Sequence, residues 1–198
     1  MSRLLTVSVG RAAPLAFSAL GAPETVASGI VKSPVSTIAR PQPVAVGALG
    51  LDGDEQVDLT VHGGRDKAVY VYPAEHYAFW ETVCAQAKVA APAGHGALGE
   101  NLTIEGLLET GAWVGDQLEI GEVALRVESP RGPCYKLDAR LGFGWASKMM
   151  IQSGYTGFYC SVVRQGKLAA GDAVLVRAGD RVVSIEQVHR LKHRPRRP

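Results

Sequence analysis

Residues 117–127 read QLEIGEVALRV, two short apolar runs separated by a Gly-Glu pair. Apolar side chains occupy alternate positions on both sides of that pair, at Leu118, Ile120, Val123, Leu125 and Val127. Successive side chains of a β-strand point to opposite faces of the sheet. The pattern therefore predicts a β-hairpin with one buried face.

Short strands punctuated by glycine continue along much of the chain. Residues 4–9 and 160–163 predict strands, and residues 173–176 and 182–183 each follow a turn that contains Gly-Asp. Many short strands with regular turns are typical of a barrel or a strongly curved sheet. The expected fold is mainly β with a few helices.

Two segments predict helices. Residues 74–88 carry apolar side chains at helical spacing directly after Pro73, which favours the start of a helix. Residues 144–152 show the same spacing over a shorter length. Residues 90–99, rich in Ala, Gly and Pro, predict a loop between these elements.

The composition is that of a globular protein, with 198 residues of which 46% are hydrophobic and 20% charged. Three widely spaced cysteines argue against a disulfide framework and a structural zinc site, and they fit a reducing compartment. No apolar run approaches the length of a membrane span. We therefore expect a cytoplasmic protein with no membrane contact.

The basic charge is concentrated at the C-terminal end. Five of the 21 Lys and Arg residues lie within residues 190–197, and the remaining 16 are outnumbered by 19 Asp and Glu residues. No nucleic-acid-binding motif accompanies this basic segment. We interpret residues 184–198 as a solvated tail and expect no specific binding of nucleic acid.

Residues 129–137, SPRGPCYKL, place Cys134 between Arg131 and Lys136 in a proline-stiffened turn. A thiolate is the nucleophilic and metal-binding form of cysteine, and nearby cations favour it. Two interpretations remain open. Cys134 is either a reactive or metal-ligating thiol, or a small hydrophobic residue buried in a turn.

Residues 53–69 form the second segment that could bind a ligand. Gly63 and Gly64 allow close backbone approach to an anion, and Arg65 and Lys67 add positive charge. The spacing is not that of a P-loop. A tight turn with solvated charges is the alternative.

Residues 99–103 and 152–159 add two polar, glycine-bearing loops. Each would pass alone as an ordinary turn. Four such loops on a β-rich body are typical of a cofactor site.

Jointly, these segments resemble the YiiM-like branch of the MOSC domain family, whose motifs occur in the same order between roughly residues 4 and 183. The matching runs are GDxQxDLxxHGGxDKAV (53–69), YPxEHYxxW (72–80), GENL (99–102), PRxPCxKL (130–137) and SGxTGFY (153–159).

The resemblance implies a β-barrel-like MOSC fold that binds the molybdenum cofactor, with Cys134 as the protein ligand to the metal. It further implies a cofactor site that combines backbone donors, cations and polar side chains. The candidates are Gly63, Gly64, Arg65, Lys67, Asn101, Arg131, Lys136, Thr156 and, more weakly, Lys32. His62 and Asp66 are the candidate proton donors.

The implied activity is reduction of N-hydroxylated compounds such as hydroxylaminopurine bases. The chain has no dinucleotide fingerprint and too few cysteines for an iron–sulfur cluster, so a flavoprotein-type partner would supply the electrons. A carrier of sulfur or of the cofactor, acting through Cys134 without turnover, is the alternative.

Relatives in this branch often continue into a helical domain. The resemblance therefore divides the chain into a MOSC domain at 1–183 and a basic tail at 184–198, a remnant of that extension. A homodimer is a further expected form of association.

Overall fold

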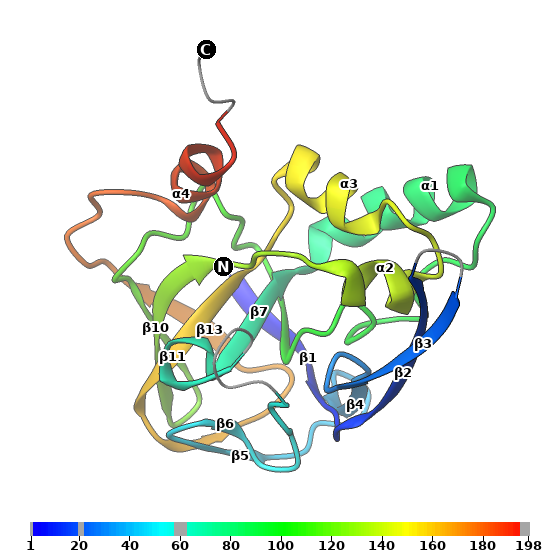
Figure 1. Ribbon diagram of the computed structural model, residues 1–198. Helices are drawn as coiled ribbons and strands as arrows, with labels where there is room; N and C mark the ends of the chain where they lie inside the picture. The colour runs from blue at the N-terminus through cyan, green and yellow to red at the C-terminus, as the bar shows by residue number, and fades with distance from the viewer. Residues whose placement is uncertain (1, 20–21, 58–62, 195–198) are drawn as a thin grey trace.

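The computed structural model describes residues 2–19, 22–57 and 63–194, and within them seven strands close a β-barrel (Figure 1). The strands are β1 (Ser2–Val9), β7 (Val69–Pro73), β8 (Leu102–Glu105), β9 (Gln117–Ile120), β10 (Val123–Pro130), β11 (Phe158–Arg164) and β13 (Ala173–Arg177). Their order is β13-β9-β10-β11-β7-β8-β1, and pairing of β1 with β13 closes the ring. Only β7 and β8 pair in parallel among these neighbours.

Smaller elements surround the barrel. β4 (Ser33–Thr37) pairs with β1, and two small sheets are formed by β2 (Ala13–Ala19) with β3 (Ala22–Ser28), and by β5 (Val44–Gly47), β6 (Gly50–Leu51) and β12 (Gly166–Leu168). The helices are η1 (Arg65–Lys67), η2 (Ala74–His76), α1 (Tyr77–Ala87), α2 (Tyr135–Leu141), α3 (Ala146–Ser153) and α4 (Ile185–Lys192). Figure 1 shows α1, α2 and α3 gathered on one side of the barrel, with α4 apart from them. No helix in the described ranges has both the length and the apolar character needed to cross a membrane.

The structure confirms the mainly β fold and the elements with clear periodicity. The predicted hairpin at 117–127 is the β9–β10 pair, with Val123 opposite Ile120. The helix expected at 74–88 begins as η2 and continues as α1, and it ends at Lys88 in a left-handed conformation. The second predicted helix is α3.

Two expectations about local structure need correction. Residues 129–137 are not a simple stiff loop, because Pro130 ends β10 opposite Phe158 and Tyr135 begins α2. Proline is tolerated in a sheet at a β-bulge, and the register of β10 with β11 shifts between Val127 and Ser129, just before Pro130. Residues 182–183 form no strand, and only an isolated bridge joins Trp113 to Ser184 beside them.

Part of the expected tail belongs to the folded body. α4 begins with a capping box in which Ser184 accepts a hydrogen bond from the Gln187 backbone N–H. Ile185 and His189 of this helix are buried, and the helix contacts β10. The buried side of α4 therefore fixes a segment of the chain that its basic charge alone had suggested to be solvated.

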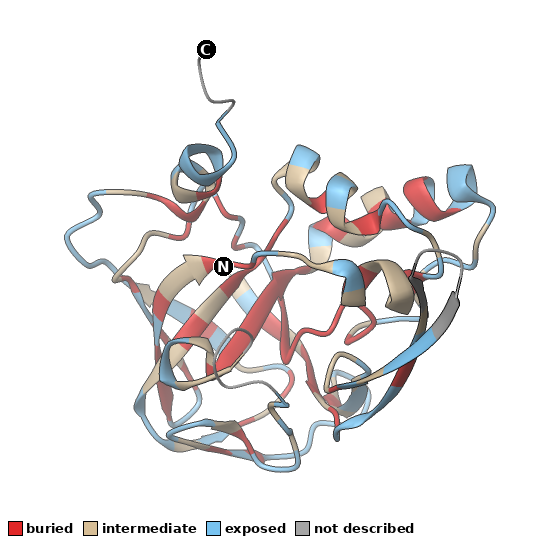
Figure 2. Ribbon diagram, viewed as in Figure 1, coloured by how far each residue is buried: buried red, intermediate tan, exposed pale blue. Residues whose placement is uncertain are grey.

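Strand β7 supplies side chains to two hydrophobic cores. Val69 and Val71 lie in the core inside the barrel, whereas Tyr70 and Tyr72 lie in a second core beneath the helices. Figure 2 shows this strand buried along its length. The second core is completed by side chains of α1, α2 and α3, among them Trp80, Leu137 and Met150. The helices are therefore fixed against the outside of the barrel wall.

Gly157 precedes β11 and packs directly against β7. A Cβ atom added here would lie 2.4 Å from the Val71 carbonyl oxygen and 2.8 Å from a ring carbon of Tyr72. We expect Gly157→Ala to lower the free energy of unfolding by about 1 to 3 kcal/mol more than Gly142→Ala does. Gly142 is the matched control, because it also has a positive φ but has open space around it. Urea unfolding measures both, and equal losses would show that backbone strain alone is responsible.

Candidate functional site

A cleft opens between the barrel, the β2–β3 hairpin and the start of α2, and five segments line it together with Tyr159 of β11. These segments lie within residues 28–32, 54–57, 67–70, 99–101 and 131–136. They are far apart in the sequence and are brought together by closure of the barrel. Of the four polar, glycine-bearing segments that the sequence singled out, 53–69, 99–103 and 129–137 each supply more than one lining residue, and 152–159 supplies Tyr159.

Cys134 lies in the lining of the cleft, directly before α2. Its backbone is extended, and its carbonyl accepts the hydrogen bond from Leu137 N (2.9 Å) that opens the helix. Leu137 is fully buried in the second core, and Pro130 is paired in the barrel wall. The thiol-bearing residue is therefore fixed from both sides while remaining partly exposed.

Arg131 connects the cysteine segment to two neighbouring parts of the cleft. Its Nη1 donates to the Leu98 carbonyl (2.6 Å), and its guanidinium carbon lies 4.8 Å from the centroid of the Tyr70 ring. Tyr70 in turn donates from its hydroxyl to the Thr156 carbonyl (2.7 Å). Burial raises the pKa of Tyr70, so the phenol keeps its proton and can act as this donor. Arg131 thus connects the cysteine segment to Leu98 and to Tyr70 of β7, and Tyr70 extends this connection to Thr156.

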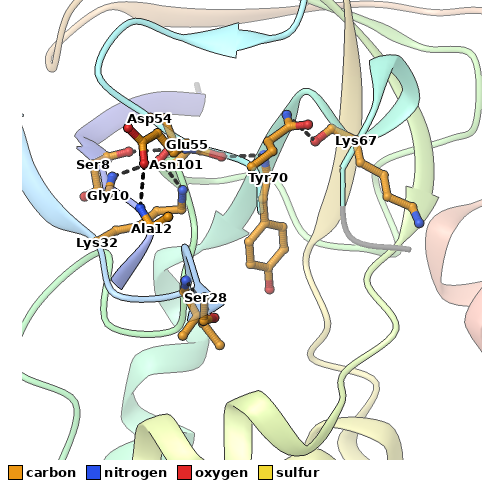
Figure 3. Close-up of polar contacts among 12 residues, drawn as sticks. Ser8, Gly10, Ala12, Ser28, Lys32, Asp54, Glu55, Lys67, Tyr70 and Asn101 are labelled. Carbon is orange, nitrogen blue, oxygen red and sulfur yellow. Dashed lines mark hydrogen bonds and ion pairs between the residues drawn. The ribbon is translucent and has the colours of Figure 1, made fainter. Parts of the chain in front are cut away.

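Asp54 is the centre of a second polar cluster in the cleft lining (Figure 3). One carboxylate oxygen accepts from Gly10 N (2.8 Å) and pairs with Lys32 Nζ, and the other accepts from Asn101 Nδ2 (2.9 Å). Asn101 Oδ1 also accepts from Tyr70 N (3.0 Å). Burial lowers the pKa of Lys32, and the paired carboxylate of Asp54 opposes that change.

Six of the residues predicted from the sequence line the cleft: Lys32, Lys67, Asn101, Arg131, Cys134 and Lys136. The others occupy different places. Arg65 and Asp66 are exposed on η1, and Gly63 and Gly64 precede that helix outside the lining. Gly64 N donates to Gln56 Oε1 (2.8 Å), so this backbone donor is engaged within the protein.

The two remaining predicted residues are Thr156, which is not part of the cleft lining, and His62. Thr156 is fully buried and acts through its carbonyl, which accepts the hydrogen bond from Tyr70. His62, a candidate proton donor, lies outside the described residues.

Sequence reasoning missed Asp54, Tyr70 and Tyr159 as parts of the cleft lining. Asp54 and Tyr159 stand inside the motifs GDxQxDL and SGxTGFY, and membership of these motifs was the available signal. Tyr70 occurs in the alternation Val69-Tyr70-Val71, which indicates a strand but not which face meets the cleft.

The donor set of the cleft fits an anionic cofactor that carries a soft metal. Cys134 offers a sulfur ligand, and Lys67, Lys136 and Arg131 place positive charge in the same lining. Among the described residues no three His, Cys, Asp or Glu side chains gather into a metal-binding group.

Comparison with known proteins gives consistent matches along the chain. The family model of the MOSC domain matches residues 58–183. An uncharacterized protein of Bacillus subtilis (strain 168), YflK, is 37% identical over 177 residues, which are 88% of this chain and 78% of that protein.

A second relative, from Gibberella moniliformis (strain M3125 / FGSC 7600), carries the name "Reductase". It is 33% identical over 133 residues, which are 67% of this chain but only 23% of that protein. Among solved structures, YiiM from Geobacillus stearothermophilus superposes with a TM-score of 0.74 and 29% identity, covering 97% of this chain and 84% of that one.

Proposed function

This chain belongs to the MOSC domain family, and from that membership we propose that it is an oxidoreductase that binds the molybdenum cofactor and reduces N-hydroxylated compounds. The family as a whole is associated with molybdenum-cofactor binding, and one relative is named a reductase. The observation that carries the proposal is the position of Cys134, a partly exposed thiol in a cleft whose lining also includes four basic side chains.

The residues of the cleft divide naturally into those that would bind the metal and those that would bind the phosphate of the pterin. The Cys134 thiolate would be the metal ligand, because soft sulfur donors suit such a metal. Lys67 and Lys136 would attract the phosphate. Arg131 would keep the cysteine segment in place through Leu98 and Tyr70. When bound, the cofactor would supply a centre able to pass two electrons to the substrate.

The proposed reaction is R–NHOH + 2e⁻ + 2H⁺ → R–NH₂ + H₂O. The N–O bond breaks, the substrate is reduced by two electrons, and the oxygen leaves as water. The electrons come from a flavoprotein-type partner, which is oxidised. The protein must therefore provide a cleft that admits the substrate and a route for protons.

The test is an assay of the protein purified from a host that makes the cofactor. We expect near-stoichiometric molybdenum and pterin, and formation of the amine from a hydroxylaminopurine base when a reduced dye replaces the partner. Chromatography measures the amine against the dye consumed. Loaded protein that forms no amine would contradict the proposal, and persulfide on Cys134 without turnover would instead support a sulfur carrier.

A further inference from the structure

The positive charge of Lys32 is already paired inside the protein. Its ammonium contacts the Asp54 carboxylate, and the two side chains are each 7% exposed. An ammonium neutralised in this way adds little net attraction for a phosphate. Lys32 is therefore poorly suited to the phosphate-binding role that the sequence suggested, although it lines the cleft.

The backbone around this pair is tightly constrained. Gly10 packs so closely on the loop before β4 that an added Cβ would lie 2.2 Å from the Val31 carbonyl oxygen. Asp54 is tied to Gly10 N (2.8 Å) and Asn101 Nδ2 (2.9 Å) from two other segments. The ammonium of Lys32 is thus held at one place in the lining.

The other cleft cations lie on different segments from this pair. Lys67 is the last residue of η1, and its Nζ lies 6.0 Å from the centroid of the Tyr159 ring. Lys136 lies in the first turn of α2. Figure 3 shows the side chain of Lys67 extending away from Lys32 and Asp54. The ion pair of Lys32 with Asp54 therefore lines the same cleft as Cys134, on segments other than those of Lys67 and Lys136.

We propose that Lys32 is the proton donor of the N–O reduction, positioned by Asp54, an assignment that rests on the proposed function. As the N–O bond breaks, the Lys32 ammonium passes one proton to the departing oxygen, which leaves as water. The nitrogen takes the second proton from solvent. Lys32 then regains a proton from solvent, so the balance of two protons and two electrons is kept.

The surroundings of Lys32 suit this role. Burial lowers its pKa, so the ammonium releases a proton more readily than that of an exposed lysine. The charged groups that act on it are Asp54 and Glu100, which raise its pKa, and Arg131, which lowers it. Removing the charge of Asp54 should therefore lower the pKa of Lys32 further.

The test compares cofactor-loaded variants of the full chain. Lys32→Arg keeps a cation that does not release its proton near neutral pH. Lys32→Met is made together with Asp54→Asn, because an unpaired buried carboxylate would destabilise the protein. Lys148→Met, on the exposed face of α3, is the matched control.

We expect Lys32→Arg and the double variant to retain pterin and molybdenum while kcat falls by about 100-fold or more. As the pH rises, the activity of Asp54→Asn should begin to fall at a lower pH than the activity of the wild type, because the donor must be protonated to act. NMR titration of isotope-labelled lysine in the wild type and Asp54→Asn measures the same change in pKa without turnover.

The experiment distinguishes failure of the Lys32 assignment from failure of the proposed function. If wild type turns over and Lys32→Arg is equally fast, or if the Asp54→Asn profile is unmoved, the assignment of Lys32 fails and the proposed function stands. Loss of pterin from Lys32→Arg would make Lys32 a cofactor ligand and overturn the assignment. Loaded wild type without turnover would overturn both.

Discussion

Replacing Cys134 by serine should remove molybdenum from the purified protein and lower the reduction of N-hydroxylated substrates by about 1,000-fold or more, the scale seen when a group essential to the reacting centre is lost. A serine hydroxyl is a harder donor than a thiolate and stays protonated near neutral pH, so it is a poor ligand for a soft metal. Elemental analysis per chain measures the metal, and the amine assay measures the activity.

Cys84→Ala is the control for this substitution. Cys84 is buried in α1, and burial raises the pKa of its thiol, so it is a poor source of thiolate. It lies outside the cleft lining, and we expect its variant to keep metal and activity. Metal retained by Cys134→Ser would refute the ligand assignment, provided that urea unfolding shows both variants to be folded.

The largest expected effect on stability is at Glu100, a fully buried residue whose carboxylate collects four hydrogen bonds. The donors are Gly96 N (2.7 Å), Leu98 N (3.2 Å), Thr103 Oγ1 (3.0 Å) and the Tyr77 hydroxyl. Glu100→Ala would leave these donors buried without their acceptor, and each such loss costs about 1 to 3 kcal/mol. We expect the free energy of unfolding to fall by about 3 kcal/mol or more.

Glu105→Ala is the matched control, because Glu105 is the last residue of β8, the strand that begins shortly after Glu100 in the chain. Its carboxylate is exposed and pairs with the exposed Arg3 at 3.7 Å. Its loss should change the free energy of unfolding by less than about 1 kcal/mol. Urea unfolding compares the two variants. Equal effects would show that Glu100 does not organise the loop before β8.

Glu100→Ala should also disturb the cleft. Glu100 holds the turn that contains Leu98, and the Leu98 carbonyl accepts the hydrogen bond from Arg131. Arg131 belongs to the segment that carries Cys134. A stability change at Glu100 is therefore expected to be accompanied by loss of bound cofactor at temperatures where the variant remains folded.

Much of the fold could be predicted because it depends on local periodicity. Alternation at 118–127 predicts the β9–β10 hairpin, and helical spacing after Pro73 predicts α1, since the side-chain directions of a strand or helix repeat at known intervals. The short helix α2 was missed because a stretch with two prolines shows no clear period before Tyr135.

The candidate site could be predicted only in part. The motif around Cys134 indicates a reactive or metal-binding thiol, because the cysteine and its cations are close in sequence. By the same reasoning Arg65 and Asp66 were expected in the site, yet they are exposed on η1 outside the cleft lining.

Sequence by itself indicated the β-rich architecture, the family and the candidate metal-binding cysteine. Tertiary structure alone decided that Lys32 pairs with Asp54, that Arg131 stacks on Tyr70, and that both arrangements border the same cleft. The physical reason is that these partners are distant in the chain. Tyr70 and Arg131 meet through the pairing of β7 with β11 and of β11 with β10, and Asp54 is held beside Lys32 by Gly10 and Asn101. No local pattern encodes these contacts.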